Sequence, residues 1–218
     1  MVNWKEMLKV LKRSLIISVI TLVLLGLVIP TATAFITEKV DPGTGNGNQI
    51  NINGKVYGSY YLAQAFNKSY FFQPRPSAIN FNQSQSGAQC CSPNTNASLL
   101  QLEKNLMEFE QMNKNVSPSR IPGAVIMDSD SGLDPNIPLS AAQLEEPRVA
   151  SSIVQFAGSK NVTLHLKLVS SFLNATINST SRQNFPVFGS YYVNVMYLDV
   201  QIIMLLMDNN VLSASSLD

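Results

Sequence analysis

The segment from Leu15 to Ile36 contains no Asp, Glu, Lys or Arg in 22 consecutive positions. A helix of that length, with a rise of about 1.5 Å per residue, spans the roughly 30 Å hydrocarbon core of a bilayer. We therefore expect a transmembrane helix over residues 15–36. A cleaved signal peptide is the alternative, because Ala32-Thr33-Ala34 has the form of a cleavage site. The apolar run is, however, longer than the roughly 7–15 residues usual in signal peptides.

The charges that flank this segment are asymmetric. The residues before it carry four bases and one acid: Lys5, Lys9, Lys12, Arg13 and Glu6. Membrane proteins retain Lys and Arg on the cytoplasmic side. The asymmetry predicts a cytoplasmic basic tail over residues 1–14 and a single pass through the cell membrane, in contact with lipid. Everything after the helix is then expected outside.

The rest of the chain is long enough for one domain with its own core. Asp41 to Gly54 is rich in Gly and Asn, so we expect a flexible stalk over residues 37–55 and an extracytoplasmic domain over residues 56–218. After residue 36 the chain has 13 acidic and 11 basic residues, which leaves no basic surface for nucleic acid. Seven Asn-x-Ser/Thr sequences are compatible with a glycosylated surface: Asn67, Asn82, Asn96, Asn115, Asn161, Asn174 and Asn178.

Cys90 and Cys91 are the only cysteines, and they are adjacent. With the single histidine, His165, they cannot supply the four ligands of a structural zinc site. We interpret them as two small residues of a polar loop, with a vicinal redox pair or an intermolecular disulfide as alternatives. His165 is expected to be a packed or surface residue, because one histidine without an acid or nucleophile partner does not make a catalytic triad.

Hydrophobic periodicity predicts an α+β fold, a single mixed α/β domain after the membrane helix. The segment 55–66 is expected to be a short strand that turns into a short helix, and 73–96 an irregular loop. The predicted strands cover 124–127 and 191–196, and the predicted helices cover 99–112, 140–152, 164–173 and 200–207. Asn96 or Ser98 is expected to cap the first helix, Ser140 the second, and Asn161 or Thr163 the third. Pro147 lacks a backbone donor and should kink the helix 140–152.

Three segments of the outer region carry motifs. The first contains Gly58, Ser59, Gln64 and Phe66, then Arg75, Pro76 and Ser77 within the run Phe71-Phe72-Gln73-Pro74-Arg75-Pro76-Ser77-Ala78. The second contains Gly132, Leu133, Asp134, Pro135 and Asn136, followed by Gln143 and Arg148. The third is Val193-Asn194-Val195 with Leu198-Asp199. In order and spacing these segments resemble the C subunit of the Kdp-type potassium-transporting P-type ATPases, whose last motif ends in Leu-Asn rather than Leu-Asp.

The motif residues are candidates for contacts with partner subunits, and several have an internal alternative. Arg75, held extended between two prolines, either ties down its own loop or makes a fork to a partner carboxylate. Asp134 and Pro135 either form a turn or helix cap or meet a partner. Arg148 is expected to pair with Glu145 or Asp134.

The sequence contains no Gly-x-x-x-x-Gly-Lys loop and no Asp-Lys-Thr-Gly-Thr segment, so we expect it neither to hydrolyse ATP nor, with one helix, to enclose a pore. The resemblance implies an accessory subunit that assembles with a channel-like potassium-selective subunit, a P-type ATPase subunit and a very small single-helix subunit. It also implies a role in raising the pump's ATP affinity. ATP and magnesium would be used by the partner ATPase subunit, and no cofactor is expected on this chain.

That implied ATP effect must be reconciled with the topology, since a domain outside the membrane has no access to cytosolic ATP. Any effect would be indirect, through coupling between sites of an assembled complex. The alternative function is a membrane-anchored extracytoplasmic solute-binding protein. Such a protein needs a concave, mostly apolar pocket with a few convergent polar groups, and no segment of the sequence marks one.

Overall fold

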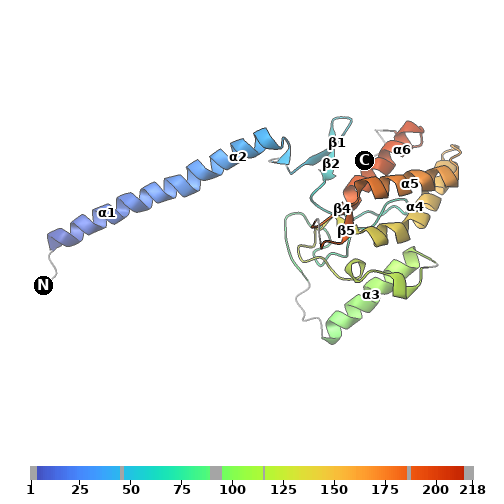
Figure 1. The fold of residues 1–218 in the computed structure, drawn as a ribbon, viewed down its shortest axis with the longest axis horizontal. Helices are drawn as coiled ribbons and strands as arrows, with labels where there is room; N and C mark the ends of the chain where they lie inside the picture. The colour runs from blue at the N-terminus through green and yellow to red at the C-terminus, as the bar shows by residue number, and fades with distance from the viewer. Residues whose placement is uncertain (1–3, 45–46, 89–94, 115, 186–187, 214–218) are drawn as a thin grey trace. The chain divides into compact units, whose positions relative to one another are not determined.

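A computed structural model describes residues 4–44, 47–88, 95–114, 116–185 and 188–213 (Figure 1). The chain divides into two compact units, Met1–Asn48 and Gln49–Asp218. The expected fold class is confirmed, because one long apolar helix precedes a mixed α/β domain. Cys90, Cys91 and Asn115 lie outside the described residues.

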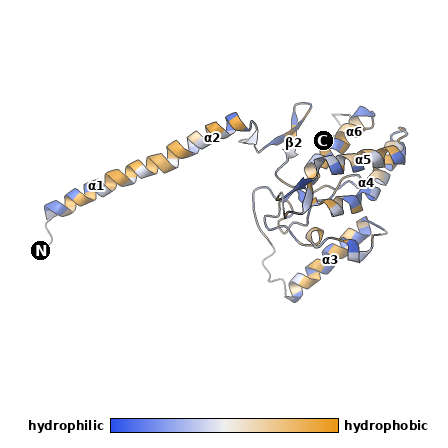
Figure 2. Cartoon of the chain, in the orientation of Figure 1, coloured by the Kyte–Doolittle hydropathy of each residue, from blue (hydrophilic) through white to orange (hydrophobic). Residues whose placement is uncertain are grey.

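The first unit contains a continuous helix of 37 residues. Hydrophobic residues occupy most of its length (Figure 2), and it is long and apolar enough to cross a membrane. At about 1.5 Å per residue it is roughly 55 Å long, so it extends beyond both ends of the expected span 15–36. It consists of α1 (Trp4–Val23), the π-helical turn η1 (Leu24–Val28) and α2 (Ile29–Val40).

The π-helical turn is explained by Pro30, the second residue of α2. A proline has no N–H to donate to the preceding turn. Ile29 N–H donates instead to the carbonyl of Leu24, five residues back, which is the π-helical pattern. The hydroxyl of Thr31 donates to the carbonyl of Leu27 at 2.7 Å. Such local bonds keep backbone polar groups paired, which a helix inside a membrane requires.

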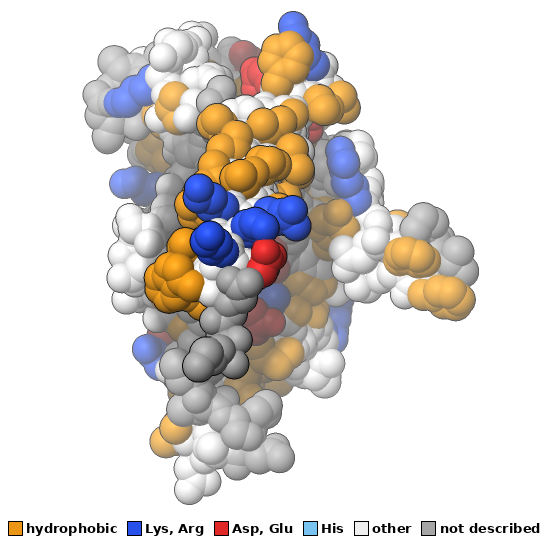
Figure 3. Space-filling model, turned by 90° about the vertical axis from the view of Figure 1, so that its left-hand side faces the viewer, with side chains coloured by type: hydrophobic (Ala, Val, Ile, Leu, Met, Phe, Trp, Pro, Cys, Tyr) orange, Lys and Arg blue, Asp and Glu red, His pale blue; other side chains and the backbone are white. Residues whose placement is uncertain are grey.

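Basic side chains gather around a single acidic one at the N-terminal end of α1 (Figure 3). Lys9 Nζ lies 2.8 Å from Glu6 Oε1, and both side chains are exposed. Positions 5, 9, 12 and 13 fall within about 100° of the helix circumference at 3.6 residues per turn. The basic tail inferred from the sequence is thus a one-sided stripe of the helix rather than a loose end.

The second unit begins with a β-hairpin, whose first strand lies in the range expected to be a flexible stalk and whose second strand is the short strand expected from residue 55. The strand β1 (Gln49–Ile52) pairs antiparallel with β2 (Lys55–Ser59). The turn between them is Asn53-Gly54, with positive φ at both residues, and an Asn-Gly turn between alternating apolar residues is a strong hairpin signal. Ile50 and Ile52 are buried, so one face of β1 belongs to the core. The helix expected after β2 is absent, since residues 60–66 have no helical structure.

The core of the second unit lies between a small sheet and three helices. The strand β5 (Tyr191–Asn194) is central, antiparallel to β3 (Asn136–Pro138) on one side and to β4 (Arg182–Gln183) on the other. Ile137 and Val193 face each other across β3 and β5 and are fully buried. The helices are α4 (Leu139–Ser159), α5 (Leu166–Thr180) and α6 (Val195–Asp208), and α4 and α5 lie side by side (Figure 1).

The predicted boundary between the last strand and the last helix is wrong. The strand β5 ends at Asn194, whose side-chain oxygen accepts a hydrogen bond from Tyr197 N–H at 3.0 Å and caps α6. Val195, expected in the strand, is therefore the first residue of a helix that was predicted to start at Val200. The longer helix carries Asp199 on its buried face.

The helix α4 differs from its prediction at both ends. It starts at Leu139 with no side-chain cap from Ser140, and it continues through Pro147 to Ser159. Pro147 is exposed. Gln143, whose carbonyl loses the usual helix bond, is also exposed, so water can replace the missing donor.

The connection between α4 and α5 corrects a predicted cap. Asn161 does not begin α5. It follows the end of α4 with φ 60°, the left-handed conformation that commonly closes a helix. His165, which is exposed, directly precedes α5, and its side chain makes no capping hydrogen bond. The helix then extends to Thr180, because buried residues recur at every fourth position as far as Ile177.

The helix α3 (Asn96–Met112) is capped by Thr95, whose hydroxyl accepts from Ser98 N–H, so neither predicted cap is correct. Its buried residues are Ser98, Asn105 and Phe109, whereas Leu99 is half exposed.

Residues 124–127, predicted to be a strand, instead contain the short 3₁₀ turn η4 (Gly123–Val125), which follows a second one, η3 (Pro118–Arg120). In a strand, the carbonyl of Ile126 would accept a hydrogen bond from a neighbouring strand. Here it accepts one from the buried side chain of Asn105, whose Nδ2 lies 2.8 Å away. The residues 73–88 have no helix or strand, as predicted for the irregular loop.

Candidate functional site

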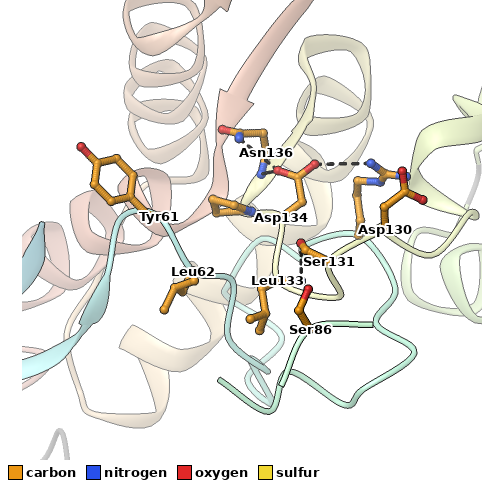
Figure 4. Close-up of a pocket in the computed structure, with 10 residues that line it drawn as sticks. Tyr61, Leu62, Ser86, Asp130, Ser131, Leu133, Asp134 and Asn136 are labelled. Carbon is orange, nitrogen blue, oxygen red and sulfur yellow. Dashed lines mark hydrogen bonds and ion pairs between the residues drawn. The ribbon is translucent and has the colours of Figure 1, made fainter. Parts of the chain in front are cut away.

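A cleft of about 630 Å³ brings residues of the first and second motifs together (Figure 4). The two motifs supply residues 59 positions apart in the sequence. The cleft is lined by the motif residues Arg75, Leu133, Asp134, Pro135 and Asn136, and also by Tyr61, Leu62, Ser86, Asp130 and Ser131. Five motif residues therefore meet at one place in the fold, beside β3.

Arg75 holds these loops together from inside the domain. Its Nε donates to the carbonyl of Ala124 at 2.9 Å, and Nη2 donates to the carbonyl of Asp128 at 3.2 Å. Its Nη1 lies 3.3 Å from Asp134 Oδ2. Of the two roles left open by the sequence, the structure shows the internal one, since the guanidinium already has acceptors on three loop segments.

Asp134 forms a turn, as its internal alternative predicted. Its Oδ1 accepts hydrogen bonds from the backbone N–H and from Nδ2 of Asn136, both at 3.0 Å. Asn136 pairs with Asn194 across β3 and β5. Asn194 Nδ2 in turn donates to the carbonyl of Tyr60 at 2.7 Å. The third motif is thereby joined to the first and second.

Gly58 and Gln64 form a second structural pair beside the hairpin. A Cβ added at Gly58 would lie 1.9 Å from Gln64 Nε2, so no other residue fits without displacing that amide. Gln64 Nε2 donates to the carbonyl of Tyr57 at 3.1 Å. The ring of Phe66 packs on Phe71 with centroids 5.1 Å apart. These motif residues shape the first segment rather than present chemistry.

Most of the remaining motif residues also serve internal contacts. The hydroxyls of Ser59 and Ser77 accept hydrogen bonds from the backbone N–H of Tyr61 and of Phe81. Three backbone carbonyls accept from a backbone N–H elsewhere in the domain: Pro76 from Ser129, Leu133 from Ala63, and Pro135 from Val195. At Gly132 the φ is 72° and an added Cβ would lie 2.5 Å from Ile79 Cγ1. Gln143 is different, because it is exposed on α4 and is not among the residues of the cleft.

Arg148 organises a second polar cluster, which is largely buried. Its Nη2 pairs with Glu145 Oε2, the first of the two partners predicted for it. Its Nε donates to Asn113 Oδ1 at 2.9 Å. Its Nη1 donates to the carbonyls of Ser69 and Phe71. One guanidinium thus ties α4 to the end of α3 and to the segment 69–71.

Two buried carboxylates hold the next residues of that segment. Glu145 Oε2 accepts from Gln73 N–H at 3.0 Å, and Asp199 Oδ1 accepts from Phe72 N–H at 2.9 Å. Both acids are 1% exposed. Burial raises the pKa of the Glu145 carboxyl, although Arg148 opposes this. Burial raises the pKa of Asp199 well above its ordinary value, and the charge of Glu145 adds to the effect.

Asp199 stands out in the sequence only as the end of the third motif. The signal that could have placed it is helical spacing, because Asp199 lies four residues after Val195 and four before Ile203, both of them buried. Because the helix was predicted to begin at Val200, Asp199 lay outside it and could not be assigned to its buried face. Among the described residues, no group of three or more His, Cys, Asp and Glu is arranged to hold a metal ion.

An apolar helix long enough to cross a membrane, joined to one mixed domain, defines a single-pass membrane-anchored protein. The model of the family KdpC, described as "K+-transporting ATPase, c chain", matches residues 11–203. The chain therefore belongs to the KdpC family, as the motifs indicated.

Several relatives named "Potassium-transporting ATPase KdpC subunit" match most of the chain. The protein from Thermoplasma volcanium is 46% identical over 197 residues, which cover 90% of this chain and 92% of the relative. The protein from Thermoplasma acidophilum is 44% identical over 206 residues, covering 94% and 98%. The protein from Caldanaerobacter subterraneus subsp. tengcongensis is 36% identical over 140 residues, covering 64% and 72%.

Proposed function

We propose that this chain is an accessory, non-catalytic subunit of an ATP-driven, high-affinity potassium import complex, which it helps to assemble and stabilise. The observation that carries the proposal is the family match over residues 11–203, together with relatives named as subunits of a potassium-transporting ATPase. The proposed partners are a channel-like potassium-selective subunit, a P-type ATPase subunit and a very small single-helix subunit.

The contacts of the motif residues support a non-catalytic role. The polar groups that the sequence singled out hold loops of the same domain: Arg75 by its three loop acceptors, Arg148 by its bonds to two further segments. Exposed Gln143 and the open side of the cleft are the places where we propose that a partner subunit makes contact.

We further propose that the N-terminus is cytoplasmic and that the folded unit from Gln49 onward lies outside, in the path of entering potassium. The basic stripe before the apolar helix supports this orientation. ATP and magnesium are then bound by the partner ATPase subunit. This chain affects apparent ATP affinity only by favouring one conformation of the pump, to the extent that it binds the two conformations differently.

Purification of the tagged full-length chain in mild detergent tests the assembly role. We expect the P-type ATPase and channel-like subunits to elute with it. The matched control replaces residues 15–36 by an unrelated apolar helix of equal length, which keeps the anchor and removes its specific packing. Recovery of the chain alone, under conditions in which the other subunits still elute together, would contradict the proposal.

Two measurements test the indirect role in ATP use. Calorimetric titration of the full-length chain with magnesium and ATP should give no saturable heat at low millimolar ATP. In the assembled pump, deletion of the unit from Gln49 onward with the anchor kept should change the potassium dependence of ATP hydrolysis. Unchanged potassium dependence would restrict the domain to assembly, and saturable ATP binding would show a direct nucleotide site.

A further inference from the structure

The apolar helix begins well before the uncharged run that is expected to cross the membrane. Residues 4–14 of α1 precede that run. At about 1.5 Å per residue, they place Trp4 roughly 16 Å from Leu15 along the helix axis. The headgroup region on one side of a bilayer is only about 5–8 Å thick. In a helix perpendicular to the membrane, Trp4 would therefore stand beyond the headgroups, in water.

This part of the helix has two contrasting sides. At 3.6 residues per turn, its charged side chains fall within about 120° of the circumference, and most of its large apolar side chains fall within about 100° on the other side. The charged side consists of Lys5, Glu6, Lys9, Lys12 and Arg13 (Figure 3). The apolar side consists of Trp4, Met7, Leu8 and Leu11, all of them exposed, with Val10 at its border. A basic amphipathic helix of this kind is typical of segments that lie against a membrane surface.

A tilt of the whole helix would bring this segment to the membrane surface. From Trp4 to Val40 the helix is roughly 55 Å long. Tilted by about 40°, the upper end of the usual range, it would extend about 42 Å along the membrane normal. A bilayer with its headgroups is about 40–45 Å thick. A tilt toward the apolar side lays that side on the lipid and keeps the charged side at the level of the headgroups.

We propose that residues 4–13 dock on the leaflet that they adjoin and select anionic phospholipids, with the apolar side on the acyl chains and the bases on the headgroup phosphates. The segment carries four bases and one acid, whereas a zwitterionic headgroup has no net charge to match them. Each base near an anionic surface favours binding by about fivefold. The proposal does not depend on the chain being a pump subunit.

The apolar side favours lipid over an acidic protein as the occupant. Leu8, Leu11 and Leu15 lie within about 60° of one another on the helix circumference, so the apolar side continues without a break into the uncharged run. An acidic protein surface would pair with the bases and leave this side in water. The ion pair between Lys9 and Glu6 is exposed, and such pairs contribute little, so Lys9 can exchange its partner for a phosphate.

The test uses the fluorescence of Trp4, which is the only tryptophan of the chain. The full-length chain is reconstituted in nanodiscs of equal parts phosphatidylcholine and phosphatidylglycerol, with bromine in the upper acyl chains of one lipid or of the other. We expect brominated phosphatidylglycerol to quench Trp4 several-fold more strongly than brominated phosphatidylcholine. The difference should shrink between 0.1 M and 1 M salt, because the Debye length falls from about 10 Å to about 3 Å.

Acrylamide, a quencher dissolved in the water, tests the docked position itself. It should quench Trp4 weakly in the chain as it is. Leu11→Gln keeps every charge but interrupts the apolar side, so it should raise quenching by acrylamide. Equal quenching by the two brominated lipids would overturn the proposal. Strong quenching of Trp4 by acrylamide, with weak quenching by both lipids, would also overturn it and would point to a protein as the occupant.

Charge variants locate the selectivity. Lys9→Gln combined with Lys12→Gln should remove most of the preference for phosphatidylglycerol. Glu6→Gln should increase the preference, because the segment then loses its only acid. Lys39→Gln, a matched change in the last turn of α2, should leave the preference unchanged. A preference that stays the same in all of these variants would place the selected lipid elsewhere and contradict the assignment.

Discussion

At the scale of single residues, Arg75 holds together loops that have little helix or strand of their own. It bonds to Ala124, Asp128 and Asp134 from a segment that has neither helix nor strand. We expect Arg75→Ala to lower the unfolding free energy of the full-length chain by about 1–3 kcal/mol, because several acceptors lose their donor at once. Denaturant unfolding in detergent, monitored by far-ultraviolet circular dichroism, measures this difference.

The matched control for this prediction is Arg120→Ala. Arg120 is an exposed arginine of η3, so its loss should change the unfolding free energy by less than about 0.5 kcal/mol. A normal unfolding free energy for Arg75→Ala, combined with a weakened complex, would show instead that the guanidinium serves a partner subunit.

Asp199 gives a pH dependence whose sign follows from its environment. Burial raises the pKa of its carboxyl in the folded chain above the unfolded value. The contribution of this residue to stability is therefore fully present below the ordinary aspartate pKa and is lost as the pH rises through the raised value. Asp199→Asn should remove that loss and stabilise the chain by about 1–3 kcal/mol at alkaline pH, where it spares an unsatisfied buried charge.

Unfolding of the wild type and Asp199→Asn across a pH series measures the difference. The two curves should converge at low pH and separate as the pH rises. The control is Asp208→Asn, the same change at the last residue of the same helix, and its curve should follow that of the wild type. Curves that separate toward low pH instead would mean that the folded carboxyl is stabilised in its charged form.

At the scale of elements, the turn through Gly132 contrasts with the helical Gly158. Gly132 has φ 72°, and a Cβ there would meet Ile79 at 2.5 Å, whereas a Cβ at Gly158 in α4 meets nothing within 4 Å. Gly132→Ala should cost about 1–3 kcal/mol of unfolding free energy. Gly158→Ala should be neutral or stabilise by up to about 1 kcal/mol, since alanine favours helix. Thermal unfolding of both variants compares them directly, and equal effects would contradict the role of the turn.

The elements also show how far the sequence could predict the fold. The apolar helix follows from the length of its uncharged run, whereas α3 and α5 follow from apolar residues that recur at helical spacing. The start of α6 was missed because the cap at Asn194 ends a strand that is itself apolar, and propensity alone cannot divide a continuous apolar run. The strand β2 was predicted, but its partner β1 was missed although Asn53-Gly54 marks the turn between them, because the polar composition of residues 41–54 was interpreted as a stalk.

The candidate site could be predicted only in part, for a similar reason. Order and spacing identified the motif residues, and five of them line one cleft. Spacing does not say which of these residues meet each other, because the bonds of Arg75 and Arg148 join segments about 50–80 positions apart. Asp199 was missed because its buried face can be recognised only when the start of α6 is known.

At the scale of the whole molecule, the basic stripe and the apolar helix predict an orientation. Protease added outside intact cells should remove the unit from Gln49 onward and leave a short protected fragment with Lys5 to Arg13, because bases are retained in the cytoplasm. Replacing those four bases by Gln should reduce the fraction of correctly oriented chains. Immunoblotting with an N-terminal tag detects the fragment, and full protection of the chain would contradict the orientation.

The bond between Phe72 N–H and Asp199 spans 127 positions, and the bond between Gln73 N–H and Glu145 spans 72. Contacts so distant in sequence form late, because a long loop must close before they repay its lost entropy. A growing chain can attach the segment 69–73 to α4 through Glu145 and Arg148, yet it cannot form the bond of Phe72 N–H until Asp199 of α6 has been synthesised. The segment that carries the first motif is therefore among the last parts of each newly made copy to reach its final structure.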